Sequence, residues 1–143
     1  MRLTIKTTAL LAAATLLAGV AASTASARAD SCWVHNGSLM RLQAVGGSRA
    51  FVYEDPKPVL RRAGVTRGTL LFEGRRVGDR YEGTARRFSR FCRAHPLVYA
   101  VGGTVSDDQL QVKMWGTYDA HRQCAPTGET KSDLLLFTYS HDC

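Results

Sequence analysis

The stretch QLQVKMW, residues 109–115, alternates between polar and apolar side chains from its first residue to Met114. Successive side chains of a β-strand point to opposite faces, so this period of two predicts a strand with one buried and one solvent-exposed face. Leu110, Val112 and Met114 form the predicted buried face. Turn residues interrupt the rest of the chain at short intervals, and the runs between them keep the same period. The sequence therefore predicts an all-β domain.

The other strands are expected on both sides of this stretch. Asn36-Gly37 predicts a type I′ hairpin turn between residues 32–35 and 38–45, because both central positions of that turn need a positive φ. Residues 56–68 begin with Pro56-Lys57-Pro58 and predict a longer extended connection with room for one helical turn. Further strands are expected at residues 51–53, 69–73, 79–87, 97–105 and 133–140, with connections at 46–47, 74–78 and 106–108.

Residues 85–94 fit two interpretations. Ala85, Phe88 and Phe91 fall at the spacing of a short basic amphipathic helix, whereas residues 81–85 are typical of a strand. Pro96 would stop a helix soon afterwards. We expect a strand that ends near Phe88 and is followed by a turn.

Seven or eight short antiparallel strands can limit their exposed edges in two ways, by closing into a barrel or by forming two packed sheets. Small residues lie within or at the end of the predicted strands, where they ease the tight bends of a small closed sheet. They are Gly83, Ala85, Gly102, Gly103 and Gly116. We expect a small antiparallel barrel, with a β-sandwich as the alternative.

The first 27 residues have the pattern of a cleaved export signal. Arg2 and Lys6 precede an apolar run at residues 9–22, and the small residues Ala25-Ser26-Ala27 follow it. The run is too short to cross a membrane, and no later segment is a candidate transmembrane span. We therefore expect residues 28–143 to form one mature domain that is periplasmic or secreted.

All four cysteines, Cys32, Cys92, Cys124 and Cys143, lie in this mature part. An even number in an exported chain predicts two disulfides. A hairpin turn near residue 107 would bring Cys92 and Cys124 together, which leaves Cys32 to join Cys143. Zinc is the weaker interpretation, because spacings such as Cys-x-x-Cys are absent. We predict no metal site and no other cofactor.

Ten arginines and no lysine lie between residues 61 and 93, opposed only by Glu73, Asp79 and Glu82. The planar guanidinium suits phosphates and carboxylates, so the cluster is a candidate anion-binding surface. The alternative is that these arginines only keep exposed strand faces soluble. The cluster consists of Arg61, Arg62, Arg67, Arg75, Arg76, Arg80, Arg86, Arg87, Arg90 and Arg93.

Aromatic residues accompany both candidate sites. Tyr81, Phe88 and Phe91 lie among the arginines and could stack on a ligand, although core packing is the better interpretation for the two phenylalanines. Trp33 and His35 flank the predicted turn at Asn36 and form a second candidate site. The alternative for this second site is structural, with Trp33 packed into one end of the barrel.

Catalytic signatures are missing from the sequence. Gly-x-Ser-x-Gly does not occur, and Glu73 with Glu82 could serve glycoside hydrolysis only if the two lie on adjacent strands. Charged pairs on wet strand faces are usually solvated surface, so we do not expect an enzyme. Nucleic acid is not an expected partner of an exported chain.

Three runs carry a resemblance to a known group. They are CWVHNGSLMRL at residues 32–42, GVTRGTLLFEG at 64–74 and YEGTARRF at 81–88. They resemble small, uncharacterised, exported bacterial envelope proteins over residues 32–139. The resemblance implies a single periplasmic domain and supplies no catalytic, metal or ligand residues.

Two functional hypotheses follow. The first is a non-enzymatic binding protein whose arginines recognise an anionic envelope component, namely a glycan, a lipid or an acidic protein. The second is an inhibitor of an envelope hydrolase that inserts residues 36–38 or 55–65 into an active site. Periplasmic lysozyme inhibitors have a similar architecture. Lysozymes are typically basic, however, and the mature chain keeps 17 basic against 12 acidic residues, a net charge of about +5.

Overall fold

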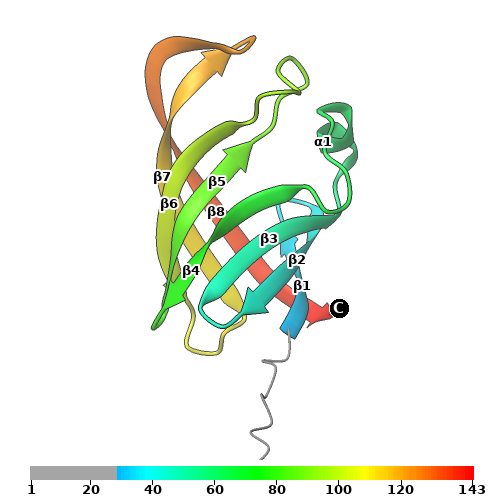
Figure 1. Ribbon diagram of the computed structural model, residues 1–143, viewed down its shortest axis with the longest axis vertical. Helices are drawn as coiled ribbons and strands as arrows, with labels where there is room; N and C mark the ends of the chain where they lie inside the picture. Colours follow the sequence, from blue (N-terminus) through cyan, green and yellow to red (C-terminus); the bar gives the residue numbers. More distant parts are fainter. Residues whose placement is uncertain (1–28) are drawn as a thin grey trace, which may run out of the picture.

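The structure, a computed structural model, describes residues 29–143, so the predicted export signal at residues 1–27 lies outside the described residues. Eight antiparallel strands follow one another around a closed barrel, and β8 returns to pair with β1 (Figure 1). The expected all-β barrel is confirmed. The elements are β1 (Ala29–His35), β2 (Ser38–Val45), β3 (Ser48–Asp55), α1 (Pro58–Arg62), β4 (Leu70–Val77), β5 (Arg80–Arg87), β6 (Leu97–Val105), β7 (Gln111–Arg122) and β8 (Ala125–Asp142).

The connections divide between the two ends of the barrel. The turns β2–β3, β4–β5 and β6–β7 lie at one end, which we call the short-turn end and which is lower in Figure 1. The β1–β2 turn, α1, the loop at residues 88–96 and the β7–β8 turn lie at the other end, which we call the long-loop end. The two longest connections therefore stand beside each other at the same opening.

Local turn chemistry explains several predicted elements. Asn36 and Gly37 have φ values of 46° and 77°, as a type I′ turn requires, and β1 and β2 pair on both sides of them. The helical turn expected after Pro56 is α1. β5 ends at Arg87, so the strand interpretation of residues 85–94 is confirmed.

Other predicted boundaries are wrong. The connection expected at residues 74–78 is shorter, because β4 continues through Gly74 to Val77 in register with β5. Leu110 lies in the β6–β7 turn and is exposed, so it does not belong to the buried face of β7. β7 and β8 also extend far beyond their predicted bounds, because they pair with each other past Trp115.

Aromatic and apolar side chains fill the middle of the barrel. Phe51 and Phe137 stack with ring centroids 3.8 Å apart, and both are completely buried. Trp33 meets Phe51 edge-on at 5.8 Å and is only 4% exposed. Tyr81 is also buried, in contact with Phe72. Trp33 and Tyr81 are therefore core residues, and neither can stack on a ligand from the surface.

Glycines permit the tight curvature of the barrel. A Cβ atom on Gly103 would lie 1.7 Å from the carbonyl oxygen of Lys113, and one on Gly83 would lie 2.1 Å from that of Glu73. Only glycine fits at such distances, which agrees with the predicted role of these residues. Gly102 is different, because a Cβ atom there would meet nothing closer than 3.6 Å.

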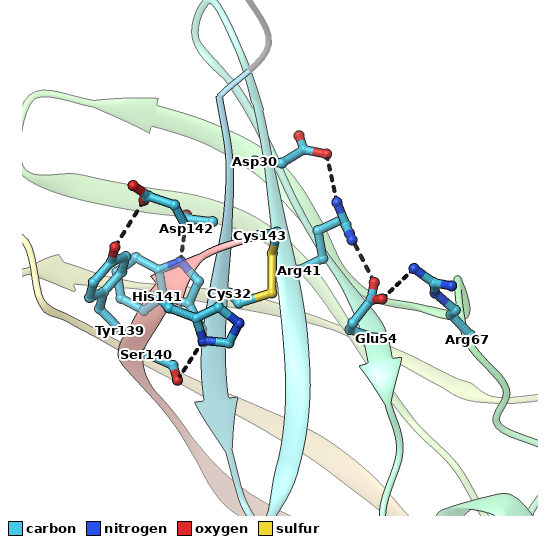
Figure 2. The surroundings of a disulfide bond; sticks show 12 residues. Asp30, Cys32, Arg41, Glu54, Arg67, Tyr139, Ser140, His141, Asp142 and Cys143 are labelled. Atoms are coloured by element: carbon cyan, nitrogen blue, oxygen red, sulfur yellow. Dashed lines mark hydrogen bonds and ion pairs between the residues drawn. A yellow bond between two sulfur atoms is a disulfide. The ribbon is translucent and has the colours of Figure 1, made fainter.

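Both predicted disulfides are present. Cys32 and Cys143 join β1 to the end of the chain, with Cα atoms 5.2 Å apart (Figure 2). Cys92 and Cys124 join the 88–96 loop to the β7–β8 turn, with Cα atoms 5.3 Å apart. Two disulfides fit a compartment outside the reducing cytoplasm.

Within residues 29–143, no helix is long and apolar enough to cross a membrane.

Candidate binding site

The ten clustered arginines do not share one face of the barrel. Three of them, Arg75, Arg76 and Arg80, lie around the β4–β5 turn at the short-turn end. The other seven belong to the long-loop end, on α1, on its connection to β4, at the end of β5 and in the 88–96 loop. These seven are Arg61, Arg62, Arg67, Arg86, Arg87, Arg90 and Arg93.

One arginine of the short-turn end links two of its turns. Arg76 donates to the Gly78 carbonyl oxygen at 2.8 Å and to the Gln109 side chain at 3.1 Å, which ties the β4–β5 turn to the β6–β7 turn. Arg80 lies 3.9 Å from Glu82 in an exposed pair. Of these three arginines, Arg76 therefore supports the neighbouring turns.

Four of the seven arginines at the long-loop end are in ion pairs. Arg61 pairs with Asp55, and Arg86 pairs with Glu73 at 2.6 Å. Arg67 pairs with Glu54, which also accepts from Arg41 (Figure 2). The Arg41 hydrogen bond is the main reason that the pKa of Glu54 is lowered; burial opposes it and Arg67 adds to it.

The ion pairs at Glu54 belong to a longer network. Arg41 also reaches Asp30 at 3.3 Å, so the ion pairs run from β1 across β2 and β3 to the connection after α1 (Figure 2). The connection after α1 is thereby fixed against the barrel wall. The fourth pair, between Arg87 and Asp133, belongs to a cavity.

Arg62, Arg90 and Arg93 have no carboxylate partner among residues 29–143, and we call them the free rim arginines. The Arg90 guanidinium lies over the Phe91 ring at 4.6 Å. Arg93 lies beside Gly64, where an added Cβ atom would be 3.8 Å from that of Arg93. The free rim arginines therefore occupy two connections that touch.

The two phenylalanines of this region differ. Phe88 packs against the core and meets Tyr53 edge-on at 5.9 Å, as expected. Phe91 is 61% exposed, so the expectation that it packs in the core is wrong. The reason is that Phe91 lies in the loop beyond the end of β5, where no strand directs its side chain inward.

A cavity of about 600 Å³ opens at the long-loop end. Its apolar wall comes from α1 and from four different strands or their ends. These apolar residues are Tyr53, Leu60, Leu71, Phe88 and Leu135. Cavities of this size, with apolar walls and a few polar groups, are typical of small-ligand sites.

Arg87, Tyr99 and Asp133 form the polar cluster of the cavity. Asp133 accepts a hydrogen bond from Arg87 at 2.8 Å and one from the Tyr99 hydroxyl at 2.5 Å. Burial disfavours the charge of Asp133, but these two hydrogen bonds and the charge of Arg87 outweigh it and lower its pKa. Burial, followed by the bond to Asp133, raises the pKa of Tyr99. The cluster is therefore a carboxylate held by a cation and a neutral phenol.

Two further polar groups face this region without a partner. Burial raises the pKa of Tyr53 to about 12, and its hydroxyl has no hydrogen-bond partner within residues 29–143. Nη1 of Arg86 is buried and unpaired as well, although its Nη2 binds Glu73. Both groups are donors that a ligand could satisfy.

His35 closes the seam between β1 and β8. The two strands stop pairing at Val34 and Thr138, and the His35 ring then stacks on Phe137 at 4.5 Å. Its Nδ1 donates to the Leu136 carbonyl oxygen at 2.9 Å. Burial lowers the pKa of His35, so its ring is neutral at pH 7. His35 and Asn36, both predicted as site residues, line the cavity.

A second cavity, of about 510 Å³, lies between the 88–96 loop and the extended β7–β8 hairpin. It shares Arg87 and Phe88 with the first cavity. The Arg87 guanidinium also lies over the Tyr118 ring at 4.3 Å. Arg87 is thus the charged side chain that lines both cavities.

Sequence reasoning named Arg87 and His35 but missed Tyr53, Tyr99 and Asp133. Tyr99 and Asp133 are 34 positions apart and meet across β7, at Gly116, which pairs with Asp133 and has no side chain to separate them. Nothing in the strand pattern marks either residue as a ligand contact.

Comparisons with protein-family models, with curated proteins and with solved structures found no match for this chain. Among residues 29–143, no group of three or more His, Cys, Asp or Glu side chains is placed to hold a metal ion.

Proposed function

We propose that this protein is a non-enzymatic binding protein that holds an anionic component of the cell envelope at the long-loop end of its barrel. The observation that carries the proposal is the presence of the free rim arginines, Arg62, Arg90 and Arg93, on two connections that touch beside a cavity. The predicted export signal and the two disulfides support a location outside the cytoplasm.

The long-loop end has more guanidinium donors than carboxylates to accept from them. The three free rim arginines have no carboxylate partner among the described residues. Arg87 donates to Asp133 through one of its guanidinium nitrogens, Nη1. A phosphate or carboxylate would accept from such donors in a bidentate manner. Because the rim is exposed, its contacts should be screened by salt.

The test compares two triple variants with the same change of charge. Arg62→Gln/Arg90→Gln/Arg93→Gln removes the free rim arginines, whereas Arg75→Gln/Arg80→Gln/Lys113→Gln removes three exposed cations toward the short-turn end. Sedimentation with vesicles that contain phosphatidylglycerol would be measured at low and at high salt. The rim variant should bind about tenfold more weakly than the wild type, since each exposed contact contributes roughly 0.5 kcal/mol.

The control variant should lose much less affinity, because its cations lie away from the rim. Equal losses in the two variants, or binding that ignores the salt concentration, would contradict the proposed site.

One observation favours a second candidate, inhibition of an envelope hydrolase. The two loops expected to enter an active site lie together, because the Lys57 amide donates to the Ser38 hydroxyl at 3.0 Å. Both loops lie at the long-loop end. Assays of lysozymes and proteases with micromolar protein test this candidate, and full enzyme activity throughout would exclude it for those enzymes.

A further inference from the structure

We infer that the ligand is an amphipathic anion with one alkyl or acyl chain, whose chain enters the cavity while its phosphate or carboxylate lies against Arg87. This inference rests on the proposed function and names the class of ligand. It follows from the chemistry of the walls, from the path of the apolar surface and from the position of Arg87.

The walls suit a chain. Leu60 and Phe88 supply partly exposed apolar surface to the lining, and Tyr53, Leu71 and Leu135, each at most 4% exposed, lie behind them. Arg87 and Asp133 belong to the same lining. Burial of each methylene in such surroundings is favourable by about 0.8 kcal/mol. The cavity is too large to be filled by a headgroup alone.

The apolar surface also continues out of the barrel. Where the pairing of β1 with β8 stops, the lining passes to Val34, Leu134 and Leu136. These three side chains are 38–51% exposed on the outer wall. The apolar lining therefore reaches the outer wall beside the His35 ring, and a flexible chain can follow such a surface better than a compact ring can.

Arg87 is placed to bind the head. It borders both cavities, its side chain is 43% exposed, and only one of its hydrogen bonds goes to Asp133. The free rim arginines lie on the two connections at the same end of the barrel. A single negative charge at this point keeps the chain beside the apolar wall.

The experiment titrates the full mature protein with a series of alkyl phosphates, from butyl to decyl, below their micelle concentrations. Calorimetry should show an affinity that rises about fourfold per methylene until the cavity is filled. Inorganic phosphate and octanol should each bind much more weakly than octyl phosphate. Tighter binding of 1-naphthoate than of every alkyl phosphate would overturn the assignment of a chain.

Two neighbouring substitutions on α1 test the location. Leu60→Trp places bulk in the cavity, and Val59→Trp places the same bulk on the solvent side of the helix. Leu60→Trp should abolish the dependence on chain length, and Val59→Trp should preserve it. Phe88→Trp is the second blocking variant should Leu60→Trp not fold.

Arg87→Gln tests the head. It should lower the preference for octyl phosphate over octanol about tenfold, the effect of losing a hydrogen bond to a charged group. Unchanged preference would overturn the role of Arg87.

The failures can be told apart. If the protein binds vesicles in a salt-dependent manner but its affinity for alkyl phosphates does not rise with chain length, this inference is wrong and the proposed function stands. If the affinity for alkyl phosphates rises with chain length but changes neither with the salt concentration nor with the rim substitutions, the proposed function is wrong and the cavity is an apolar binding site.

Discussion

The middle of the barrel interior is filled by Phe51 and Phe137, with Val112 beside them, whereas at the long-loop end the same strands surround a cavity of about 600 Å³. The filled part has close backbone contacts such as that of Gly103 with β7. The hollow part holds its walls with ion pairs and a disulfide. Apolar burial therefore supports the fold in one part of the barrel, while polar side chains remain available at the long-loop end.

The largest expected effect concerns the covalent links. Replacing Cys32 and Cys143 by serine should lower the free energy of unfolding by about 5 kcal/mol, because the bond closes a loop with a separation of 111 residues. Replacing Cys92 and Cys124 should cost about 3.5 kcal/mol, for a separation of 32. Urea unfolding of both double variants measures the two losses, and the reverse order would show that the long-loop end is the main support.

Core truncation should also distinguish the two regions. Phe51→Ala removes a fully buried ring that contacts Phe137 and Trp33, and should cost about 3–5 kcal/mol. Leu60→Ala, on the wall of the cavity, should cost clearly less, because its surroundings are already partly open. Equal losses in urea unfolding would mean that the cavity is closed in solution.

A pair of adjacent glycines gives a smaller effect with its own control. Gly103→Ala forces a Cβ atom into the β7 backbone and should cost about 1–3 kcal/mol. Gly102→Ala finds ordinary spacing and should change the stability by less than about 1 kcal/mol. Thermal unfolding of both variants checks the prediction. A loss at Gly102 as large as that at Gly103 would refute the close approach of β6 and β7.

The smallest effect is a dependence on pH at the long-loop end. The pKa of His35 is lowered in the folded protein, so the unfolded chain binds more protons as the pH falls below the ordinary value of 6.5. The stabilisation by neutral His35 is therefore present above that pH and is lost as the pH falls through the folded value. His35→Phe, which keeps a ring against Phe137, should flatten the stability profile between about pH 7 and pH 5. An unchanged slope would show that His35 is not the group responsible.

The periodic pattern located β6 because Tyr99, Val101 and Val105 point inward at every second or fourth position. The outer halves of β7 and β8 could not be located in this way. Most of residues 117–132 are exposed, so no buried face marks their alternation. Their pairing is visible only in the register of the two strands.

The candidate site shows a similar limit. The charge count drew attention to Arg87, but it also included Arg75, Arg76 and Arg80, which lie at the opposite end. Sequence distance cannot separate the two groups, because β4 and β5 each run the length of the barrel wall. Their ends therefore lie far apart in space although their residues are close in the chain.

The extended β7–β8 hairpin has a consequence for how copies of this chain meet. Pairing between β6 and β7 stops at Val101 and Gly116. Beyond these residues, the β6 edge that would face β7 and the β7 edge that would face β6 are unpaired, although β7 still pairs with β8. The Cys92–Cys124 bond holds these edges near each other across the second cavity. Without the bond the hairpin could swing away and pair with the same region of another molecule, as strand exchange between subunits requires. The Cys92–Cys124 bond therefore opposes strand exchange between copies of this chain.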